Sequence, residues 1–129
     1  MSITKNLNLT PSADSKAVAA YLQAQESKDF SASETFMSDD VYFNGLVLNQ
    51  KGRMKISQAM AEFLPAIKTL ALEAATQIVS GDTSEYLVLY NFQIHGQKSP
   101  QSLCDRVVVR DGLITRIDNV FDLAKLPQP

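Results

Sequence analysis

The spacing of apolar residues changes once along the chain, and this change constrains the fold more than any other feature. Before Pro65, apolar side chains recur every three or four positions, which is typical of amphipathic helices. After Pro65 they alternate with polar side chains, which is typical of strands with one buried face. Helices followed by a run of antiparallel strands predict an α+β layer fold in which the sheet curls over the helices.

Three helices are expected in the first half of the chain. The first begins at residues 10–11, because Thr caps free amides and Pro suits the first helical position, and it ends near Ser27. A capping-box pattern at residues 31–34 opens a short second helix that runs through Phe36. Pro65 ends or bends the third helix. The apolar stripe of that helix consists of Ile56, Ala59, Met60, Phe63 and Leu64.

Five strands are expected, at residues 41–44, 70–78, 85–95, 101–110 and 113–122. Polar residues 38–40 break the chain before the first strand, and Gly45 stops it. A turn at residues 81–84 and a loop at residues 96–100 separate the next strands. The pair Asp111-Gly112 is a strong signal for a two-residue hairpin turn.

The length of 129 residues fits one domain, which we place at residues 11–126, between a flexible leader at 1–10 and a tail at 127–129. The net charge is −2 and the basic residues are scattered, which argues against nucleic acid and against an anionic membrane as partners. The leader lacks the apolar core of a signal peptide, and no apolar run reaches transmembrane length. We therefore expect a cytoplasmic protein.

The chain contains one cysteine, Cys104, and one histidine, His95. An internal disulfide and a zinc site built from several cysteines and histidines are therefore excluded, and we expect neither a metal nor a cofactor. A lone His beside Gly96 is typical of a solvated loop residue. Cys104 has no neighbouring His to activate it, so packing is its expected role.

Strand alternation predicts which side chains point inward. Between residues 101 and 110, the face that holds Arg106 and Arg110 belongs outside, so the face that holds Asp105 belongs inside. The other expected inward residues are Leu103, Val107 and Val109, then Val88, Tyr90, Phe92 and Ile94 on the long strand, and Ile117, Asn119 and Phe121 on the last. Both faces of the sheet are fairly apolar, and a homodimer through the outer sheet face is the simplest second cover.

Four segments together resemble the nuclear transport factor 2-like superfamily, and in particular its SnoaL-like (polyketide cyclase/ketosteroid isomerase-like) domain. They are Tyr21 with Lys28-Asp-Phe30, Thr35-Phe-Met-Ser-Asp-Asp-Val-Tyr-Phe-Asn44, Lys51-Gly-Arg53, and Cys104-Asp-Arg-Val-Val-Val-Arg-Asp-Gly-Leu-Ile-Thr-Arg-Ile117 with Val120-Phe-Asp122. The resemblance spans nearly the whole chain. It implies three N-terminal helices packed in the concave face of a curved antiparallel sheet, forming a cone-shaped α+β barrel around an apolar pocket.

The resemblance also implies candidate site residues. Ketosteroid isomerases place an oxyanion-binding Tyr and a protonated Asp where Tyr21 and Asp105 stand, but Asn44 or Gly45 replaces their base. Polyketide cyclases use a pocket Asp as acid/base, for which Asp105 is the candidate. The expected substrate-binding residues are Tyr42, Asn44, Tyr90, Phe92, Asn119 and Phe121.

Limonene epoxide hydrolase-like enzymes hold a water with a Tyr-x-Asn pattern, which Tyr42-Phe-Asn44 matches. Their Asp-Arg-Asp machinery does not carry over, because Tyr90, Phe92 and Asn119 stand at those positions. Epoxide hydrolysis is therefore disfavoured.

Three functional hypotheses follow. The first is a cofactor-independent isomerase, cyclase or dehydratase that acts on a small hydrophobic molecule, with Asp105 as acid/base and Tyr21 as hydrogen-bond donor. The second is a non-catalytic binder of a small hydrophobic ligand in the same pocket. The third is a dimerisation or scaffold module. In the second and third, Asp105 is a carboxylate held by ordinary partners and Tyr21 is a core aromatic with its hydroxyl satisfied.

Overall fold

The computed structural model describes residues 10–45 and 48–121. The leader at residues 1–9, the expected end of the last strand at Asp122, and the domain end at 126 with the tail that follows it lie outside the described residues. In the described ranges, no helix has an apolar stretch long enough to cross a bilayer.

Helices and strands follow one another as the change of period predicts. In chain order the elements are α1 (Ala13–Ser27), the 3-10 helix η2 (Phe30–Phe36), β1 (Met37–Asn44), β2 (Asn49–Lys51), α2 (Arg53–Phe63), the 3-10 turn η3 (Leu64–Ala66), β3 (Ile67–Ser80), β4 (Thr83–Ile94), β5 (Gln101–Arg110) and β6 (Leu113–Phe121).

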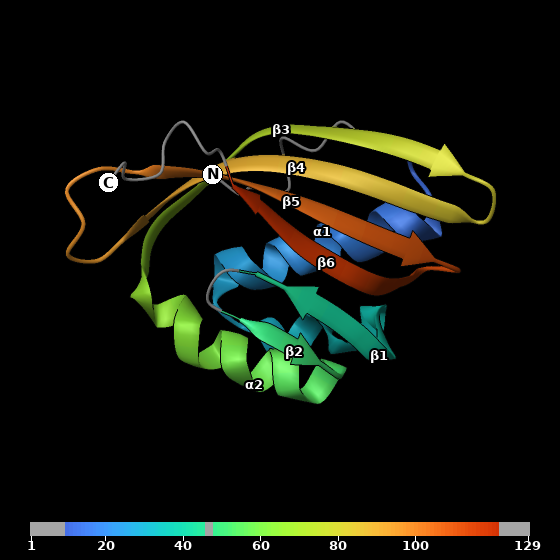
Figure 1. Cartoon of the computed structure of the whole chain (residues 1–129), viewed down its shortest axis with the longest axis horizontal. Helices are drawn as coiled ribbons and strands as arrows, with labels where there is room; N and C mark the ends of the chain where they lie inside the picture. The colour runs from blue at the N-terminus through green and yellow to red at the C-terminus, as the bar shows by residue number, and fades with distance from the viewer. Residues whose placement is uncertain (1–9, 46–47, 122–129) are drawn as a thin grey trace.

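The six strands form one curved sheet in the order β2-β1-β6-β5-β4-β3. All neighbouring strands are antiparallel except β1 and β6, which run parallel. The long strands β3 to β6 arch over α1, and β1, β2 and α2 lie below them in the view of Figure 1. The predicted α+β fold, with three helices packed on the curved sheet, is confirmed, although the sheet is open and does not close into a barrel.

The first helix begins two residues later than the sequence predicts. Its N-cap is Ser12, not Thr10, and the Ser12 hydroxyl accepts from the backbone N–H of Ser15 at 3.0 Å. The Ser15 hydroxyl oxygen in turn accepts from the backbone N–H of Ser12 at 2.8 Å. This reciprocal capping box satisfies two free amides at once, which a cap at Thr10 does not. The helix ends at Ser27 as predicted, with Lys28 in the left-handed conformation at φ 59°.

Two local predictions between the helices are wrong. The short helix η2 begins at Phe30 and has no side-chain cap, because the Ser31 hydroxyl donates to the Asp29 carboxylate instead of closing a capping box. The chain also does not break at residues 38–40, since β1 runs through them. Its pairing with β6 contains an irregularity between Met37 and Tyr42, which accommodates these polar residues.

The hairpin between β5 and β6 forms as predicted. Asp111 and Gly112 both have positive φ, at 53° and 77°, as a type I′ turn requires. The predicted inward face of β5 is buried at Leu103, Asp105 and Val107. The strand β6 carries a bulge opposite Val108 and Val109, so its inward set starts at Ile114 and continues at Ile117. The sheet therefore keeps its apolar face toward the helices along the whole hairpin.

Candidate active site

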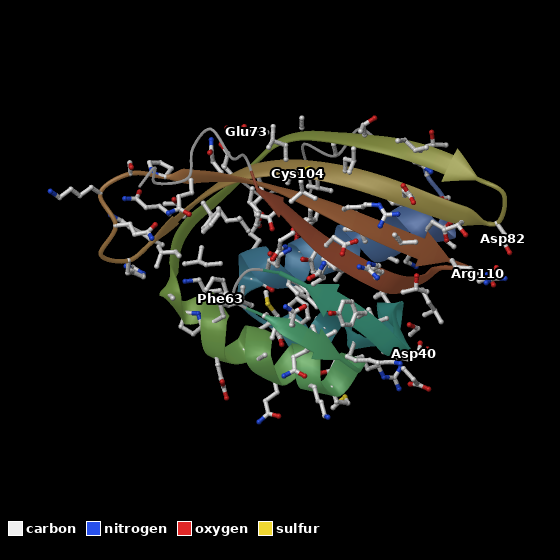
Figure 2. The ribbon with its side chains drawn as sticks, in the orientation of Figure 1. Asp40, Phe63, Glu73, Asp82, Cys104 and Arg110 are labelled. Atoms are coloured by element: carbon white, nitrogen blue, oxygen red, sulfur yellow. The ribbon has the colours of Figure 1, made fainter. Side chains whose placement is uncertain are left out.

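A cavity of about 510 Å³ lies between the concave face of the sheet and the helices. Most of the lining side chains are apolar or aromatic, as is usual for small-molecule sites. They come from α1, α2 and β1, from β3 to β6, and from the loop segments next to them. The lining residues are Tyr21, Gln25, Phe43, Leu48, Ala59, Met60, Glu62, Phe63, Ile67, Tyr90, Phe92, Ile94, Gln97, Gln101, Leu103 and Asn119. Figure 2 labels Phe63, which contributes from α2.

Three neutral side chains hold the buried carboxyl group of Asp105. The hydroxyl groups of Tyr21 and Tyr90 both donate to Oδ2 of Asp105, at 2.9 Å and 2.8 Å. The amide Nδ2 of Asn119 donates to Oδ1 at 2.5 Å. Each donor sits on a different element around β5, since Tyr21 belongs to α1, Tyr90 to β4 and Asn119 to β6. The sheet register accounts for the last contact, because Asn119 lies directly opposite Asp105.

The environment of Asp105 changes its acidity. Burial raises the pKa of Asp105 from its ordinary value of 3.8 to about 6, against the lowering effect of the hydrogen bonds from Tyr90, Tyr21 and Asn119. Burial and the nearby charge of Asp105 raise the pKa values of Tyr21 and Tyr90 well above the ordinary value of 10. The two hydroxyl groups therefore stay protonated at neutral pH, and the carboxyl group titrates near the pH range where acid/base groups work best.

Asp105 itself does not line the cavity, whereas its three hydrogen-bond donors do. Tyr21, Tyr90 and Asn119 thus stand between the carboxylate and the open space. A molecule in the cavity meets these neutral groups first. The hydroxyl groups of Tyr21 and Tyr90 therefore connect the carboxyl group of Asp105 to residues of the cavity wall.

Gly45 is a glycine because Asn119 approaches it closely. A Cβ atom at residue 45 would lie 2.2 Å from Oδ1 of Asn119 and 3.0 Å from the ring of Phe43. Real side chains do not tolerate the first distance, so any other residue would push the Asn119 amide away from Asp105. In the sequence the pair Asn44-Gly45 is a turn signal, and nothing in it reveals this contact.

Two predicted pocket residues lie away from the cavity. The hydroxyl of Tyr42 donates to Oδ1 of Asn49 at 2.9 Å, and the Arg116 guanidinium stacks on the Tyr42 ring at 5.2 Å. Asn44 is exposed, and its amide donates to Asp118 at 3.2 Å. Strand alternation explains both corrections, because it turns the intervening residue, Phe43, toward the cavity.

The other predicted substrate-binding residues are placed as follows. Tyr90, Phe92 and Asn119 line the cavity. Phe121 is the last residue of β6, and its side chain lies outside the described part of the structure. His95 is exposed at the end of β4, as expected for a loop residue. Cys104 is partly buried, and burial together with the charge of Asp105 raises the pKa of its thiol, which fits a packing role.

Gln25 lines the cavity and was not predicted from the sequence. It lies one helical turn after Tyr21 on α1, and its side chain is 5% exposed. Its side chain lies close enough to the Tyr21 hydroxyl to lower the pKa of that group, although within the described residues its Nε2 makes no hydrogen bond of normal geometry. The weak hydrogen bond leaves this buried amide only partly satisfied. The helical spacing of Tyr21 and Gln25 is the only sequence signal that links them.

Comparison with known proteins supports the same fold. Residues 18–117 match the family model of the SnoaL-like domain. No curated protein sequence matches the chain.

Within the described residues, no group of three or more His, Cys, Asp or Glu side chains is arranged to hold a metal ion.

Solved structures with low sequence identity share the architecture. A proposed polyketide cyclase from Sinorhizobium meliloti is 20% identical with a TM-score of 0.67, and the alignment covers 91% of this chain and 98% of that one. A protein of ketosteroid isomerase-like fold from Catenulispora acidiphila, in complex with trimethylamine, is 20% identical with a TM-score of 0.69 over 84% and 86%. A de novo designed protein with a curved sheet is 16% identical with a TM-score of 0.67 over 90% of each chain. At these identities the likeness shows the fold alone.

Proposed function

The chain belongs to the SnoaL-like domain family, and from that membership and its cavity we propose that it binds a small hydrophobic molecule and carries out cofactor-independent acid/base chemistry on it. The observation that supports this most is the hydrogen-bonded cluster of Asp105 with Tyr21 and Tyr90 beside an apolar cavity. A fold of this kind is compatible with small-molecule binding and with cyclase or isomerase chemistry.

The proposed chemistry is a proton relay through a tyrosine. A substrate C–H or O–H bond breaks and leaves its electron pair on the substrate, while the proton passes to the hydroxyl oxygen of Tyr90 or Tyr21. The proton of that hydroxyl moves at the same time to Oδ2 of Asp105, so the tyrosine stays neutral and Asp105 becomes the protonated acid. The reverse relay returns the proton to another substrate atom. Isomerisation, cyclisation and dehydration each consist of such a pair of transfers.

A pKa of about 6 suits Asp105 to both halves of this relay. An ordinary aspartate is too weak a base at neutral pH, and burial brings its basicity closer to the working range. Donors already in place around a charge also lower the cost of reorganisation during proton transfer. The pair of tyrosines therefore stabilises the anion and conducts the proton.

A second candidate function is binding without chemistry. The observation that favours it is the position of Asp105 behind its three donors, away from the cavity wall. In that case the hydrogen bonds of Asp105 serve only to hold α1 against the sheet. The cavity then only holds a hydrophobic ligand.

We also propose a homodimer that forms through the outer face of the sheet. That face carries partly exposed apolar side chains, among them Ile78 and Val120, which are 52% and 48% exposed. Such a surface is typical of a contact with a second copy.

The test of the enzyme proposal uses proton exchange, because it requires no knowledge of the natural substrate. Small cyclic ketones and enones are incubated with the protein in D₂O, and deuterium incorporation beside the carbonyl is followed by NMR. We expect catalysed exchange for at least one ketone that binds, with loss of exchange in Asp105→Asn and a partial loss in Tyr90→Phe. The matched control is Glu73→Gln, which changes an exposed carboxylate outside the cavity.

Two outcomes would redirect the proposal. Exchange that is equally fast in Asp105→Asn would remove Asp105 from the chemistry. Tight binding of ketones without exchange, together with an unaltered ligand that co-purifies and is detected by native mass spectrometry, would favour the binder.

A further inference from the structure

Among the described residues, the side chains that line the cavity carry no positive charge, and the Lys28 ammonium lies outside the lining, where it donates to the backbone carbonyl of Ile67 at 2.8 Å. No Lys, Arg or His from residues 10–45 or 48–121 lines the cavity, and Glu62 is the charged residue in its wall. Behind the wall lies Asp105, whose carboxyl group accepts hydrogen bonds from the neutral groups of Tyr21, Tyr90 and Asn119. Within the described residues, no cation forms an ion pair with Asp105. The ionised carboxylate therefore leaves an uncompensated negative field in an apolar space, where charges are poorly screened.

The hydroxyl groups of Tyr21 and Tyr90 also favour a cation over an anion. A tyrosine hydroxyl carries one proton, and both tyrosines donate theirs to Oδ2 of Asp105. The oxygens of Tyr21 and Tyr90 can then only accept hydrogen bonds from a ligand. Gln25 adds a neutral amide whose donor lies toward the Tyr21 oxygen, an acceptor in the wall itself, so it does not require an anionic ligand.

The aromatic side chains in the wall suit a cation as well. Tyr21, Phe43, Phe63, Tyr90 and Phe92 contribute to the lining from four different elements. The electron-rich face of an aromatic ring attracts an alkylated ammonium group within about 6 Å of the ring centre. Such groups combine an apolar surface with positive charge, and they therefore need no strong hydration inside an apolar cavity.

We propose that the cavity selects a hydrophobic amine or quaternary ammonium compound over neutral and anionic molecules of the same shape. This inference rests on the proposed small-molecule function and narrows its ligand class. In the complex, the cation lies beside the oxygens of Tyr21 and Tyr90 with Asp105 ionised behind them. The apolar part of the ligand fills the space toward Met60 and Phe63 on α2.

Three probes that carry a tetrahedral group of different charge on a phenyl ring test the selectivity. They are phenyltrimethylammonium, tert-butylbenzene and benzenesulfonate. Binding to the intact protein is measured from the ¹³C-methyl NMR signal of Met60, which lines the cavity. We expect the ammonium to bind at least about tenfold more tightly than the neutral isostere, a ratio typical of one nearby opposite charge in a partly desolvated site, and the sulfonate not to bind.

Substitutions locate the origin of the selectivity. In Asp105→Asn we expect the ammonium and the neutral probe to bind within about threefold of each other, since most of the field is lost. Glu62→Gln should reduce the ratio less, because Glu62 is exposed, and Glu73→Gln should leave it unchanged. The comparison of the three probes in the unaltered protein tests the proposal even if Asp105→Asn does not fold.

The outcomes separate this inference from the proposed function. Equal or tighter binding of tert-butylbenzene, or binding of the sulfonate, would overturn the charge selectivity and leave the small-molecule cavity intact. The absence of any shift at Met60 with all three probes would contradict both.

Discussion

The hydroxyl of Tyr90 on β4 donates to the buried carboxylate of Asp105 on β5 at 2.8 Å, and Tyr21 on α1 donates to the same oxygen at 2.9 Å. One carboxylate oxygen thus connects two strands and a helix inside the apolar core. Within residues 10–45 and 48–121 no cation contacts Asp105, and neutral donors stabilise its charge. This arrangement stabilises an anion only in part, which leaves Asp105 easily protonated.

Removal of one donor should make Asp105 a weaker acid still. In Tyr90→Phe we expect the pKa of Asp105 to rise above its value of about 6, because the Tyr90 hydrogen bond lowers it. Tyr21→Phe should raise the pKa by a smaller amount, since its hydrogen bond has the smaller effect. NMR titration of the Asp105 carboxyl group in both variants checks the order. An unchanged or lower pKa in Tyr90→Phe would show that this hydrogen bond does not stabilise the anion.

Ionisation of Asp105 should destabilise the protein as the pH rises. The pKa is higher in the folded state, at about 6, than the ordinary 3.8, so the folded state binds more protons between these values. The stability that protonated Asp105 contributes to the folded state is therefore fully present below pH 3.8 and is lost as the pH rises through 6. Relative to Asp105→Asn, the unfolding free energy of the unaltered protein should fall by about 2 kcal/mol between pH 4 and pH 7. Urea titrations of both proteins across this pH range measure the difference in unfolding free energy. If the unaltered protein instead gained stability relative to Asp105→Asn as the pH rose, the pKa of Asp105 would not be raised in the folded state.

The glycine at residue 45 should matter through Asn119. In Gly45→Ala the new methyl group displaces the Asn119 amide, so Asp105 loses a donor and its pKa rises. We expect a loss of about 1–3 kcal/mol of stability from the overpacked site. In an Asn119→Ala background the same substitution should cost much less, because the clashing atom is gone. Additive effects in this double-mutant cycle would mean that Gly45 is required for another reason.

The N-terminus of α1 should depend on a contact that is distant in sequence. Asp14 accepts hydrogen bonds from the Ser84 hydroxyl at 2.7 Å and from the backbone N–H of Gly112 at 2.8 Å. It thereby connects the start of α1 to β4 and to the turn between β5 and β6. Asp14→Ala should cost about 1–3 kcal/mol, since both donors lose a charged acceptor. The control is Asp82→Ala, whose exposed ion pair with Arg110, visible at the turn end of the sheet in Figure 2, should be worth about 0–1 kcal/mol. Equal costs in chemical denaturation would contradict this difference.

The proposed homodimer should respond to charge on the outer sheet face. Val120→Glu places a carboxylate in the proposed contact, so we expect dissociation in sedimentation-velocity experiments. Met54→Glu is the matched control, because Met54 is 62% exposed on α2, on a different side of the molecule. A monomeric unaltered protein, or dissociation by Met54→Glu alone, would exclude this interface.

The change of hydrophobic period was enough to predict the fold class, because helices and strands bury their faces at different spacings. The pair Asp111-Gly112 and the alternation in β5 placed the last hairpin within one or two residues. The errors concern the start of α1 and the strand β2. Ser12 and Ser15 satisfy more backbone amides than a cap at Thr10, and the strand β2, with three polar residues, has no periodic signal of its own.

The candidate site was only partly accessible from the sequence. The inward position of Asp105 followed from the two arginines on the opposite face of β5, and the position of Asn119 followed from alternation in β6. The side of β1 that faces the cavity was predicted wrongly, so Phe43 was missed in favour of Tyr42 and Asn44. Contacts such as that between Gly45 and Asn119 depend on the close approach of distant segments, which no local pattern encodes.

The carbon-detected NMR titration of the Asp105 side chain in the unaltered protein, with Asp105→Asn for assignment, tests the proposed acid/base centre most directly. We predict a pKa of about 6, the value expected for a buried carboxylate that only neutral donors stabilise. A pKa at or below the ordinary 3.8 would mean that Asp105 is solvated or paired with a cation, and it would contradict both the proton relay and the uncompensated charge beside the cavity.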